Sequence, residues 1–310
     1  MPNRSGRVSS TTAAAPFLKW AGGKRQLLPE LKRFVPVSFT AYTEAFLGSG
    51  ALFFNLAAEG RLATVPVSLV DRNADLIGTY RALAREPARV IDLLHELARR
   101  HARSGAAHYY KVRGELFNRD RRALRELGTP DAFSAGLAAQ FLYLNRTCFN
   151  GLFRLNARGE FNVPAGRYVN PRICDERNLM RVATLLAQPN VFIFRDSFER
   201  LRATAEPGEF IYFDPPYAPV SSTARFRSYT AEGFSDDDQV RLQRLVIELA
   251  RRGCHVLVSN SVAPQIAALY ENNLDARRAG LRAHRVAARR AINRTASRRG
   301  PVEEFLISNV

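Results

Sequence analysis

The residues 214–217 read DPPY, follow a short apolar run, and bring together groups that suit a bound aromatic amine. Asp214 supplies a carboxylate that can accept hydrogen bonds. Pro215 and Pro216 have no N–H to donate and a fixed φ, so the backbone after Asp214 is stiff and its carbonyl groups are free to accept. Tyr217 adds a flat ring on which a base can stack. The four residues therefore predict a rigid pocket for an amino group such as that of adenine.

Two further acids occupy the same kind of position. Asp71 and Asp196 each end a β-rich run, at 65–71 and 190–196. A single Asp after a strand is often only a turn residue. In an open α/β sheet, however, ligands bind outside the carboxyl ends of the strands, so three acids at strand ends indicate one shared crevice.

A glycine-containing turn supplies the other half of this crevice. Gly48 and Gly50 lie where a short strand is expected to turn into a helix, an arrangement that lets backbone approach a ligand closely. Phe53 stands where the dinucleotide fingerprint has its third glycine, and Asp71 lies at the end of the next strand, where an acid can bind both ribose hydroxyls. The turn and the acid together predict an adenosine-containing ligand without a cradled pyrophosphate, although the turn alone fits an ordinary loop equally well.

Periodicity indicates the elements that must position these residues. Buried strands are expected at 65–71, 190–196, 209–214, 254–260 and 304–309, and helices at 73–85, 175–187 and 236–253, the last opened by Ser235 as N-cap. Strands that alternate with helices predict a doubly wound, largely parallel sheet. Between 86 and 174 the alternation stops, and long helical patterns lead into a loop rich in Gly, Asn and Arg. This stretch reads as an inserted second domain.

The charge balance indicates the partner. The chain of 310 residues has 46 Lys and Arg against 29 Asp and Glu, a formal net charge of +17, which predicts a polyanion as ligand. No run approaches the roughly 18 to 20 apolar residues of a membrane-spanning helix. The three cysteines are far apart and suit neither a disulfide framework nor a metal site, so we expect a reducing cytoplasm. Residues 1–15 read as a disordered tail.

Three motifs occur in an order that is typical of one enzyme family. The motifs are, in chain order, FLKWAGGKRQLLPEL (17–31), FLGSG (46–50) and DPPY (214–217), and the insert lies between FLGSG and DPPY. With these motifs the chain resembles the Dam-type DNA adenine-N6 methyltransferases (D12 class, alpha group) over residues 16–309. The resemblance implies an α/β fold: a Rossmann-like S-adenosylmethionine-dependent methyltransferase sheet with an inserted, mainly helical DNA-recognition domain. The catalytic domain would comprise 16–85 and 175–310, and the recognition domain 86–174.

The resemblance also assigns the residues of the site. Lys24 suits the cofactor because an ammonium group is a counter-charge for the methionine carboxylate, although WAGGKR could otherwise be a flexible basic loop. No metal is expected. The implied catalytic residues are Asp214, Pro215, Pro216 and Tyr217, and the implied S-adenosylmethionine-binding residues are Trp20, Lys24, Phe46, Gly48, Gly50, Asp71, Asp196, Phe198 and Asp214.

The loop at the end of the insert resembles the family's recognition pattern. Arg154 falls where an arginine reads guanine, Arg167 where a side chain meets the DNA backbone, and Phe149 where an aromatic ring wedges into the base stack. Thr147, Cys148 and Leu155 depart from the pattern, which leaves the outer base preferences open. Residues 289–300 resemble the family's late hairpin beside the target base. The implied DNA-binding residues are Lys19, Arg146, Phe149, Asn150, Arg154, Pro164, Arg167 and Tyr168.

The resemblance implies methyl transfer to N6 of adenine in double-stranded DNA at GATC, with the target base flipped out, by a monomer in the cytoplasm of a bacterium or a phage-infected cell. Two alternatives stay open. One is an enzyme that methylates adenine in RNA or cytosine N4 in DNA with the same strand-end motif. The other is a non-catalytic, basic nucleic-acid-binding protein, against which the intact set of Lys24, Asp71 and Asp214 speaks.

Overall fold

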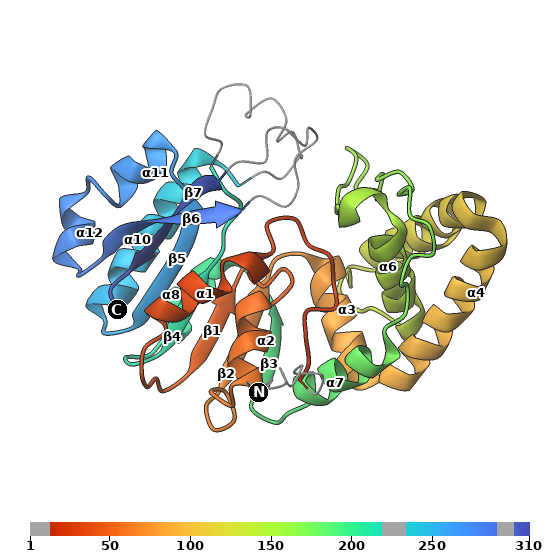
Figure 1. Ribbon diagram of the computed structural model, residues 1–310, viewed down its shortest axis with the longest axis horizontal. Coiled ribbons are helices and arrows are strands. Elements are labelled where there is room, and N and C mark those ends of the chain that lie inside the picture. Colours follow the sequence, from red (N-terminus) through yellow and green to blue (C-terminus); the bar gives the residue numbers. More distant parts are fainter. Residues whose placement is uncertain (1–12, 219–233, 290–300) are drawn as a thin grey trace, which may run out of the picture.

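The structure, a computed structural model, describes residues 13–218, 234–289 and 301–310. These residues form an α/β fold around a seven-stranded sheet with the strand order β3-β2-β1-β4-β5-β7-β6 (Figure 1). The strands are β1 (Tyr42–Ala45), β2 (Val67–Asp71), β3 (Val191–Arg195), β4 (Phe210–Phe213), β5 (His255–Ser261), β6 (Arg282–Arg289) and β7 (Pro301–Ser308).

The strands β1 to β5 pair in parallel, whereas β7 is antiparallel to both β5 and β6. From β1 the chain continues to β2 and β3 on one side, and it then returns to β4 on the other side of β1. The strand order therefore reverses between β1 and β4, and this reversal is the place where α/β sheets bind ligands. The predicted α/β class with a largely parallel methyltransferase-type sheet is confirmed.

The antiparallel edge was only partly predicted. The strand expected at 304–309 corresponds to β7, which begins three residues earlier and ends one residue earlier, and no strand was predicted at β6. Of the predicted late hairpin at 289–300, residues 290–300 lie outside the described residues.

The central strand β4 is buried on both faces, which explains its unbroken apolar sequence. Phe210 and Tyr212 face one core, and Ile211 and Phe213 face the other. The helices that pack into the second core are α8 (Leu201–Thr204), α10 (Asp236–Arg251), α11 (Pro264–Leu269) and α12 (Leu274–Arg278). Ser235 caps α10 in a reciprocal capping box with Asp238, so the predicted N-cap is confirmed.

The first core contains the helices nearer to the insert. They are α1 (Leu28–Leu31), α2 (Ala51–Ala58), α3 (Ala74–Arg85), α4 (Pro87–Lys111), α6 (Ala135–Thr147) and α7 (Glu176–Leu186). The 3-10 turns are η1 (Lys24–Gln26), η2 (Lys32–Phe34), η4 (Phe149–Gly151) and η5 (Phe198–Arg200). Between α4 and α6 lie a π-helical segment, η3 (Val112–Asn118), and α5 (Arg119–Glu126). The main-chain angles of Gly105 bend α4.

The core of the insert is continuous with the core of the sheet. Phe117 and Phe141 belong to the same cluster of buried side chains as Tyr42 of β1. In Figure 1, α4 and α6 stand beside the sheet as a second lobe, with α3 between the two parts. Ala15, at the end of the predicted tail, exchanges two hydrogen bonds of 2.9 Å with the side-chain amide of Asn178 of α7, through its N–H and its carbonyl. Residues 1–12 lie outside the described residues. The predicted domain boundaries stay a prediction.

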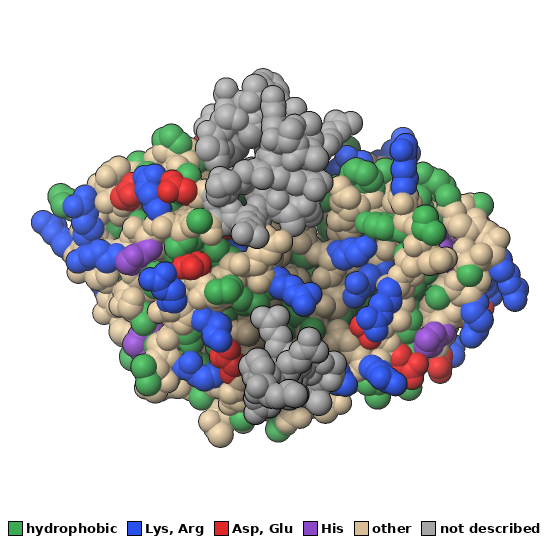
Figure 2. All heavy atoms as spheres, in the orientation of Figure 1, with side chains coloured by type: hydrophobic (Ala, Val, Ile, Leu, Met, Phe, Trp, Pro, Cys, Tyr) green, Lys and Arg blue, Asp and Glu red, His purple; other side chains and the backbone are tan. Residues whose placement is uncertain are grey.

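Among the described residues, no helix has the length and apolar character needed to cross a bilayer. On the face shown in Figure 2, Lys and Arg side chains are more widespread than Asp and Glu side chains, and several lie across the middle of the view, where the sheet meets the helical lobe.

Candidate active site

The DPPY segment leaves the carboxyl end of β4, next to the loop that follows β1. Its path is fixed by a buried pair of amides. Gln239 of α10 donates from Nε2 to the carbonyl of Pro216 (3.0 Å), and Asn260 of β5 donates from Nδ2 to Gln239 Oε1 (3.0 Å). Asn260 Oδ1 accepts from the N–H of Ala218 (3.4 Å). Gln239 and Asn260 thus fix the backbone of the DPPY segment through hydrogen bonds at Pro216 and Ala218. Sequence reasoning missed both residues.

The Asp214 carboxylate receives two donors on one oxygen. Lys24 Nζ lies 2.9 Å from Oδ1, and Ser259 Oγ donates to the same atom at 2.8 Å. Burial raises the pKa of Asp214, while the charge and hydrogen bond of Lys24 and the hydrogen bond of Ser259 oppose that shift. No described residue donates to Oδ2, so this oxygen is available to a ligand.

The ring of Tyr217 lies against the same cluster. Lys24 Nζ is 4.3 Å from the ring centroid, and it also donates to the carbonyl of Gly22 at 2.8 Å. The Tyr217 hydroxyl donates to Glu304 Oε2 of β7 at 2.6 Å. Burial, and then the neighbouring carboxylates of Asp214 and Glu304, raise the pKa of Tyr217, so the phenol stays neutral. Glu304 therefore fixes the ring from the far side, a role that no sequence pattern indicated.

The turn after β1 needs its glycines for steric reasons. Gly48 has φ +49°, and a Cβ at this position would lie 2.8 Å from Cδ1 of Trp20. Gly50, with φ +65°, opens α2. Phe46 also has a positive φ, of 60°. The turn therefore brings the backbone against the Trp20 indole. The predicted close approach of this backbone to a ligand stays a prediction.

Asp71 ends β2 and closes against this turn. Its carboxylate accepts from the N–H of Gly48 (3.1 Å) and from the N–H of Asn73 (2.9 Å). Burial raises the pKa of Asp71, and these backbone hydrogen bonds oppose the shift. Asp71 is thus bonded to the glycine turn that packs on Trp20, whereas Lys24 is bonded to Asp214 at the end of β4.

The predicted residues Asp196 and Phe198 follow β3, and the first is exposed whereas the second is buried. The N–H of Asp196 bonds to the carbonyl of Asp71 (3.1 Å), and its exposed carboxylate bonds to Ser197 N–H and to Arg200. Phe198 is buried, and its ring stacks on Phe46 with a centroid distance of 5.5 Å. The two rings form an apolar wall beside the strand ends.

Sequence reasoning missed a buried glutamate in β1. Glu44 of β1 is 2% exposed and accepts from the Tyr42 hydroxyl (2.7 Å) and the Phe53 N–H (2.8 Å). Burial raises the pKa of Glu44 to about 8, against the effect of both hydrogen bonds, and the charge of Asp214 adds to the rise. The one signal in the sequence was an acid within the short strand Tyr42–Ala45.

The predicted recognition loop folds as a hairpin. An antiparallel bridge joins Leu155 to Phe161, and we call residues 154–162 the recognition hairpin. The Arg154 side chain is exposed, and its Nε donates to Asn162 Oδ1 at 2.8 Å. Arg167 is also exposed and makes no hydrogen bond or ion pair with another described residue. Asn162 thus orients Arg154, one of the three predicted DNA-binding arginines, whereas Arg167 is held by no described residue.

The other predicted DNA-binding residues lie around the start of the hairpin. Phe149 is 45% exposed, next to Asn150 with φ 55°, and its N–H bonds to the carbonyl of Pro164 (2.9 Å). Lys19 Nζ lies 4.1 Å from the centroid of the Tyr168 ring. Arg146 instead donates to the carbonyl of Phe17 (2.7 Å), so in this structure it holds the N-terminal motif.

The N-terminal motif contacts the insert directly, at α6 and at the residue just before the recognition hairpin. Asn145 of α6 exchanges two hydrogen bonds with the backbone of Lys19, of 2.8 and 2.7 Å. The indole of Trp20 stacks on Phe153 with a centroid distance of 5.8 Å. Residues 17–31 and the insert, which are far apart in sequence, thus pack against each other.

Comparisons with known proteins agree with this arrangement. A family model described as D12 class N6 adenine-specific DNA methyltransferase matches residues 20–292. The chain is 37% identical over 295 residues to the Type II methyltransferase M1.LlaDCHI of Lactococcus lactis subsp. cremoris, with 95% of each chain covered. It is 38% identical over 305 residues to the Type II methyltransferase M.MjaIII of Methanocaldococcus jannaschii, with 95% of this chain and 98% of the relative covered. It is 35% identical over 290 residues to the DNA adenine methylase of Escherichia coli, with 94% and 93% covered.

Proposed function

Because this chain belongs to the family of D12 class N6 adenine-specific DNA methyltransferases, we propose that it methylates adenine N6 within GATC in duplex DNA, using S-adenosylmethionine and a flipped-out target base. The family establishes an enzyme that acts on adenine in DNA. The sequence GATC, the flipped base and the roles of individual residues are the proposal.

One observation carries the proposal: two acceptors at the end of β4 have no donor among the described residues. They are Asp214 Oδ2 and the carbonyl of Pro215, whereas the next carbonyl, of Pro216, is bonded to Gln239. An amino group carries two N–H donors, so it can satisfy both acceptors at once. The Tyr217 ring beside them offers a stacking face for the base that bears this amino group.

The residues of the crevice suit the cofactor. Gly48 packs on Trp20 with no space for a Cβ, and its N–H holds the Asp71 carboxylate in place. Asp71 would accept hydrogen bonds from ribose hydroxyls, and the Phe46 and Phe198 rings would border the adenine ring. S-adenosylmethionine supplies a methyl group bound to a positively charged sulfur. Lys24 would pair with its carboxylate.

The chain's own groups would act on the target nitrogen. The lone pair of an adenine amino group is delocalised into the ring, which makes it a weak nucleophile. Hydrogen bonds to Asp214 and the Pro215 carbonyl favour a more tetrahedral nitrogen and disperse the positive charge that develops on it. Glu304 fixes the Tyr217 ring, so that the stacked base is held in alignment, and alignment contributes much of the rate.

The target base must leave the duplex to reach this pocket, at a cost of a few kcal/mol of stacking and pairing. Exposed Phe149 would fill part of the gap in the stack. Arg154 keeps its terminal nitrogens free of described partners while Asn162 holds Nε, which suits a fork that bonds both major-groove acceptors of guanine. These placements support recognition of a guanine-containing site.

The test is to incubate the protein with methyl-labelled S-adenosylmethionine and a GATC duplex, a matched duplex without GATC, or RNA, and then to identify the labelled nucleoside. We expect N6-methyldeoxyadenosine from the GATC duplex. Asp214→Ala should lose at least about a thousand-fold in turnover, because the lost contact acts in the transition state, and it should retain DNA binding. Label in cytosine or in RNA, or near-normal turnover by Asp214→Ala, would contradict the proposal.

A further inference from the structure

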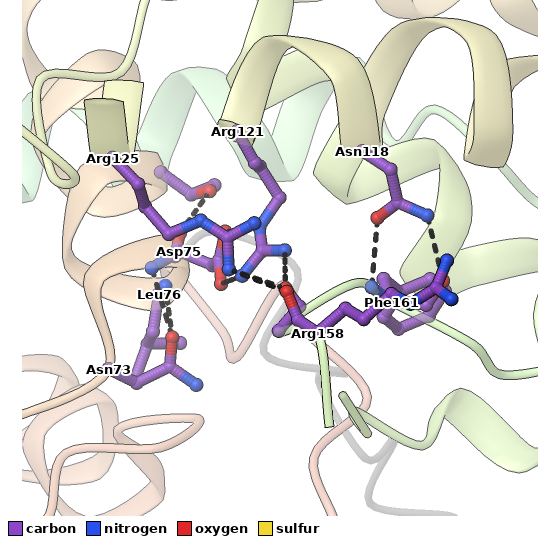
Figure 3. Close-up of polar contacts among 10 residues, drawn as sticks. Asn73, Asp75, Leu76, Asn118, Arg121, Arg125, Arg158 and Phe161 are labelled. Carbon is purple, nitrogen blue, oxygen red and sulfur yellow. Dashed lines mark hydrogen bonds and ion pairs between the residues drawn. The ribbon is translucent and has the colours of Figure 1, made fainter. Parts of the chain in front are cut away.

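The recognition hairpin is held by one face of a single helical segment. Four residues that follow the i, i+3, i+4, i+7 spacing each contact the hairpin: Asn118, Arg121, Arg122 and Arg125. Asn118 exchanges two hydrogen bonds with the backbone of Phe161, of 3.0 and 2.8 Å (Figure 3). The tip of the hairpin therefore does not stand free, since its backbone is bonded to α5 and the residue before it.

Two of the three arginines, Arg121 and Arg125, donate to the same carbonyl. Arg121 Nη1 lies 2.7 Å from the oxygen of Gly159, and Arg125 Nη1 lies 3.0 Å from it. Gly159 has φ +69°, and a Cβ there would overlap the Arg125 guanidinium, so the tip can pack this closely only as glycine.

Of these four residues, only Arg121 also forms hydrogen bonds with α3, which precedes the insert. Its Nε donates to Asp75 Oδ1 and its Nη2 donates to Asp75 Oδ2 at 2.7 Å. The two side chains are only 7% and 6% exposed. This is a two-pronged, desolvated ion pair, which fixes both the distance and the orientation of its partners (Figure 3).

Asp75 is itself tied to the strand end that faces the cofactor. The side chain of Asn73 caps α3 by accepting from the N–H groups of Asp75 (3.0 Å) and Leu76 (3.1 Å). The N–H of the same Asn73 donates to Asp71 Oδ1 at 2.9 Å. An unbroken series of hydrogen bonds thus runs from Asp71 through Asn73, Asp75 and Arg121 to Gly159.

We propose that Arg121 is a positioning residue that ties the recognition hairpin to the cofactor end of β2, so that cofactor binding and DNA recognition strengthen each other through it. The inference rests on the proposed function, which gives the hairpin and Asp71 their ligands. A ligand on Asp71 restricts the capping turn at Asn73, and this restriction orders the carboxylate that holds Arg121. The hairpin is then set in place before it meets the DNA.

Linkage makes this measurable, because the factor by which the cofactor tightens DNA binding equals the factor by which DNA tightens cofactor binding. The probe is S-adenosylhomocysteine, which cannot transfer a methyl group. Its affinity is read from the fluorescence of Trp20, the one tryptophan of the chain, with and without a saturating GATC duplex. In the wild-type protein we expect DNA to tighten binding by roughly five-fold or more.

Two variants remove the link. Arg121→Lys keeps the charge but loses the fork, so it cannot bond both Asp75 oxygens and the Gly159 carbonyl. The double variant Asp75→Asn with Arg121→Gln removes both buried charges together, which leaves no unpaired charge in the core. Each should bring the coupling factor close to one while thermal unfolding remains cooperative. The matched control is Arg125→Gln, which loses a bond to the same carbonyl but makes no hydrogen bond or ion pair with α3, and it should keep the wild-type factor.

A measurement on the wild-type protein without DNA separates this inference from the proposed function. S-adenosylhomocysteine should slow amide hydrogen exchange in residues 154–162, and Arg121→Lys should abolish that effect. Unchanged exchange, a wild-type coupling factor of one, an unchanged factor in both link variants, or an equal loss in Arg125→Gln would each overturn the inference. Absence of methylation by the wild-type enzyme would contradict the proposed function alone.

Discussion

At the scale of single residues, the site depends on which side chains bond to the Asp214 carboxylate. Lys24 and Ser259 both reach Oδ1, and the other oxygen is left for a ligand. The sequence predicted Asp214 and Lys24 because both stand in motifs whose chemistry can be read locally. It could not predict Ser259 or Glu304, which lie 45 and 87 positions from their partners and which occur as ordinary strand residues. Only the pairing of β4, β5 and β7 brings them to the site.

Glu44 gives a residue-scale prediction about pH. Burial raises the pKa of Glu44 from 4.5 to about 8, so between these values the folded protein holds a proton that the unfolded chain releases. The unfolding free energy should therefore fall as pH rises through this window, by at most about 1.4 kcal/mol per pH unit from this group. Glu44→Gln removes the effect and can still bond Tyr42 and the Phe53 N–H.

Urea denaturation of both proteins from pH 5 to 9 measures this. The stability of Glu44→Gln relative to wild type should increase with pH and level off above about 8, when Glu44 is charged in both states. Because the other buried acids are common to both proteins, their contributions cancel in the difference. Parallel profiles would show that Glu44 titrates normally.

At the scale of elements, local chemistry predicted the parallel strands well and the antiparallel edge poorly. β2, β3, β4 and β5 are apolar runs with a turn or an acid at the end, and each was predicted within about two residues. β6 contains three arginines and three alanines in eight residues, so neither apolar alternation nor β-branched enrichment marks it. It is a strand because β7 pairs with it along its whole length, which is tertiary information.

The glycine turn after β1 carries an element-scale prediction. Gly48→Ala would place a Cβ against Trp20 and strain the backbone at a positive φ, so it should weaken S-adenosylmethionine binding at least about ten-fold, since 1.4 kcal/mol is one factor of ten. Isothermal calorimetry measures the affinity. Gly60→Ala is the control, because Gly60 has φ +73° but open space around a Cβ. Equal affinities in the two variants would mean that strain alone, and not contact with Trp20, matters.

The hairpin gives a second prediction at this scale. Arg154→Ala should reduce the preference for guanine at one position of each half-site by roughly 1 to 3 kcal/mol, because the two-pronged contact is lost. Asn162→Ala should lose part of the same preference, since Asn162 holds the Arg154 Nε. Methylation rates on GATC and on every single-base variant measure both. Full preference in the Arg154 variant would remove this residue from base reading.

At the scale of the whole molecule, the insert is less separate than its sequence indicates. The predicted boundaries rest on a change of sequence pattern, but the buried side chains of α4 and α6 join the core on one face of the sheet. The Asp75–Arg121 pair lies at the same junction. A pattern shift marks where the chain leaves the sheet, and it carries no information about how the two parts pack together afterwards.

The net charge of +17 gives the last prediction, because general attraction to phosphate depends on salt, whereas base reading depends on it far less. Arg167→Ala should weaken binding to all duplexes alike and lower the slope of log affinity against log salt by about one, since one phosphate contact is lost. Arg251→Ala is the matched control, since it also removes one exposed charge. Arg251 ends α10 just before β5 begins, so it lies near the amino ends of the parallel strands, whereas Asp214 follows the carboxyl end of β4. Titrating both variants and the wild-type protein with GATC and non-cognate duplexes at several salt concentrations measures the slopes. The same slope in Arg167→Ala and Arg251→Ala would mean that Arg167 meets no phosphate and that the DNA follows another path across the basic surface.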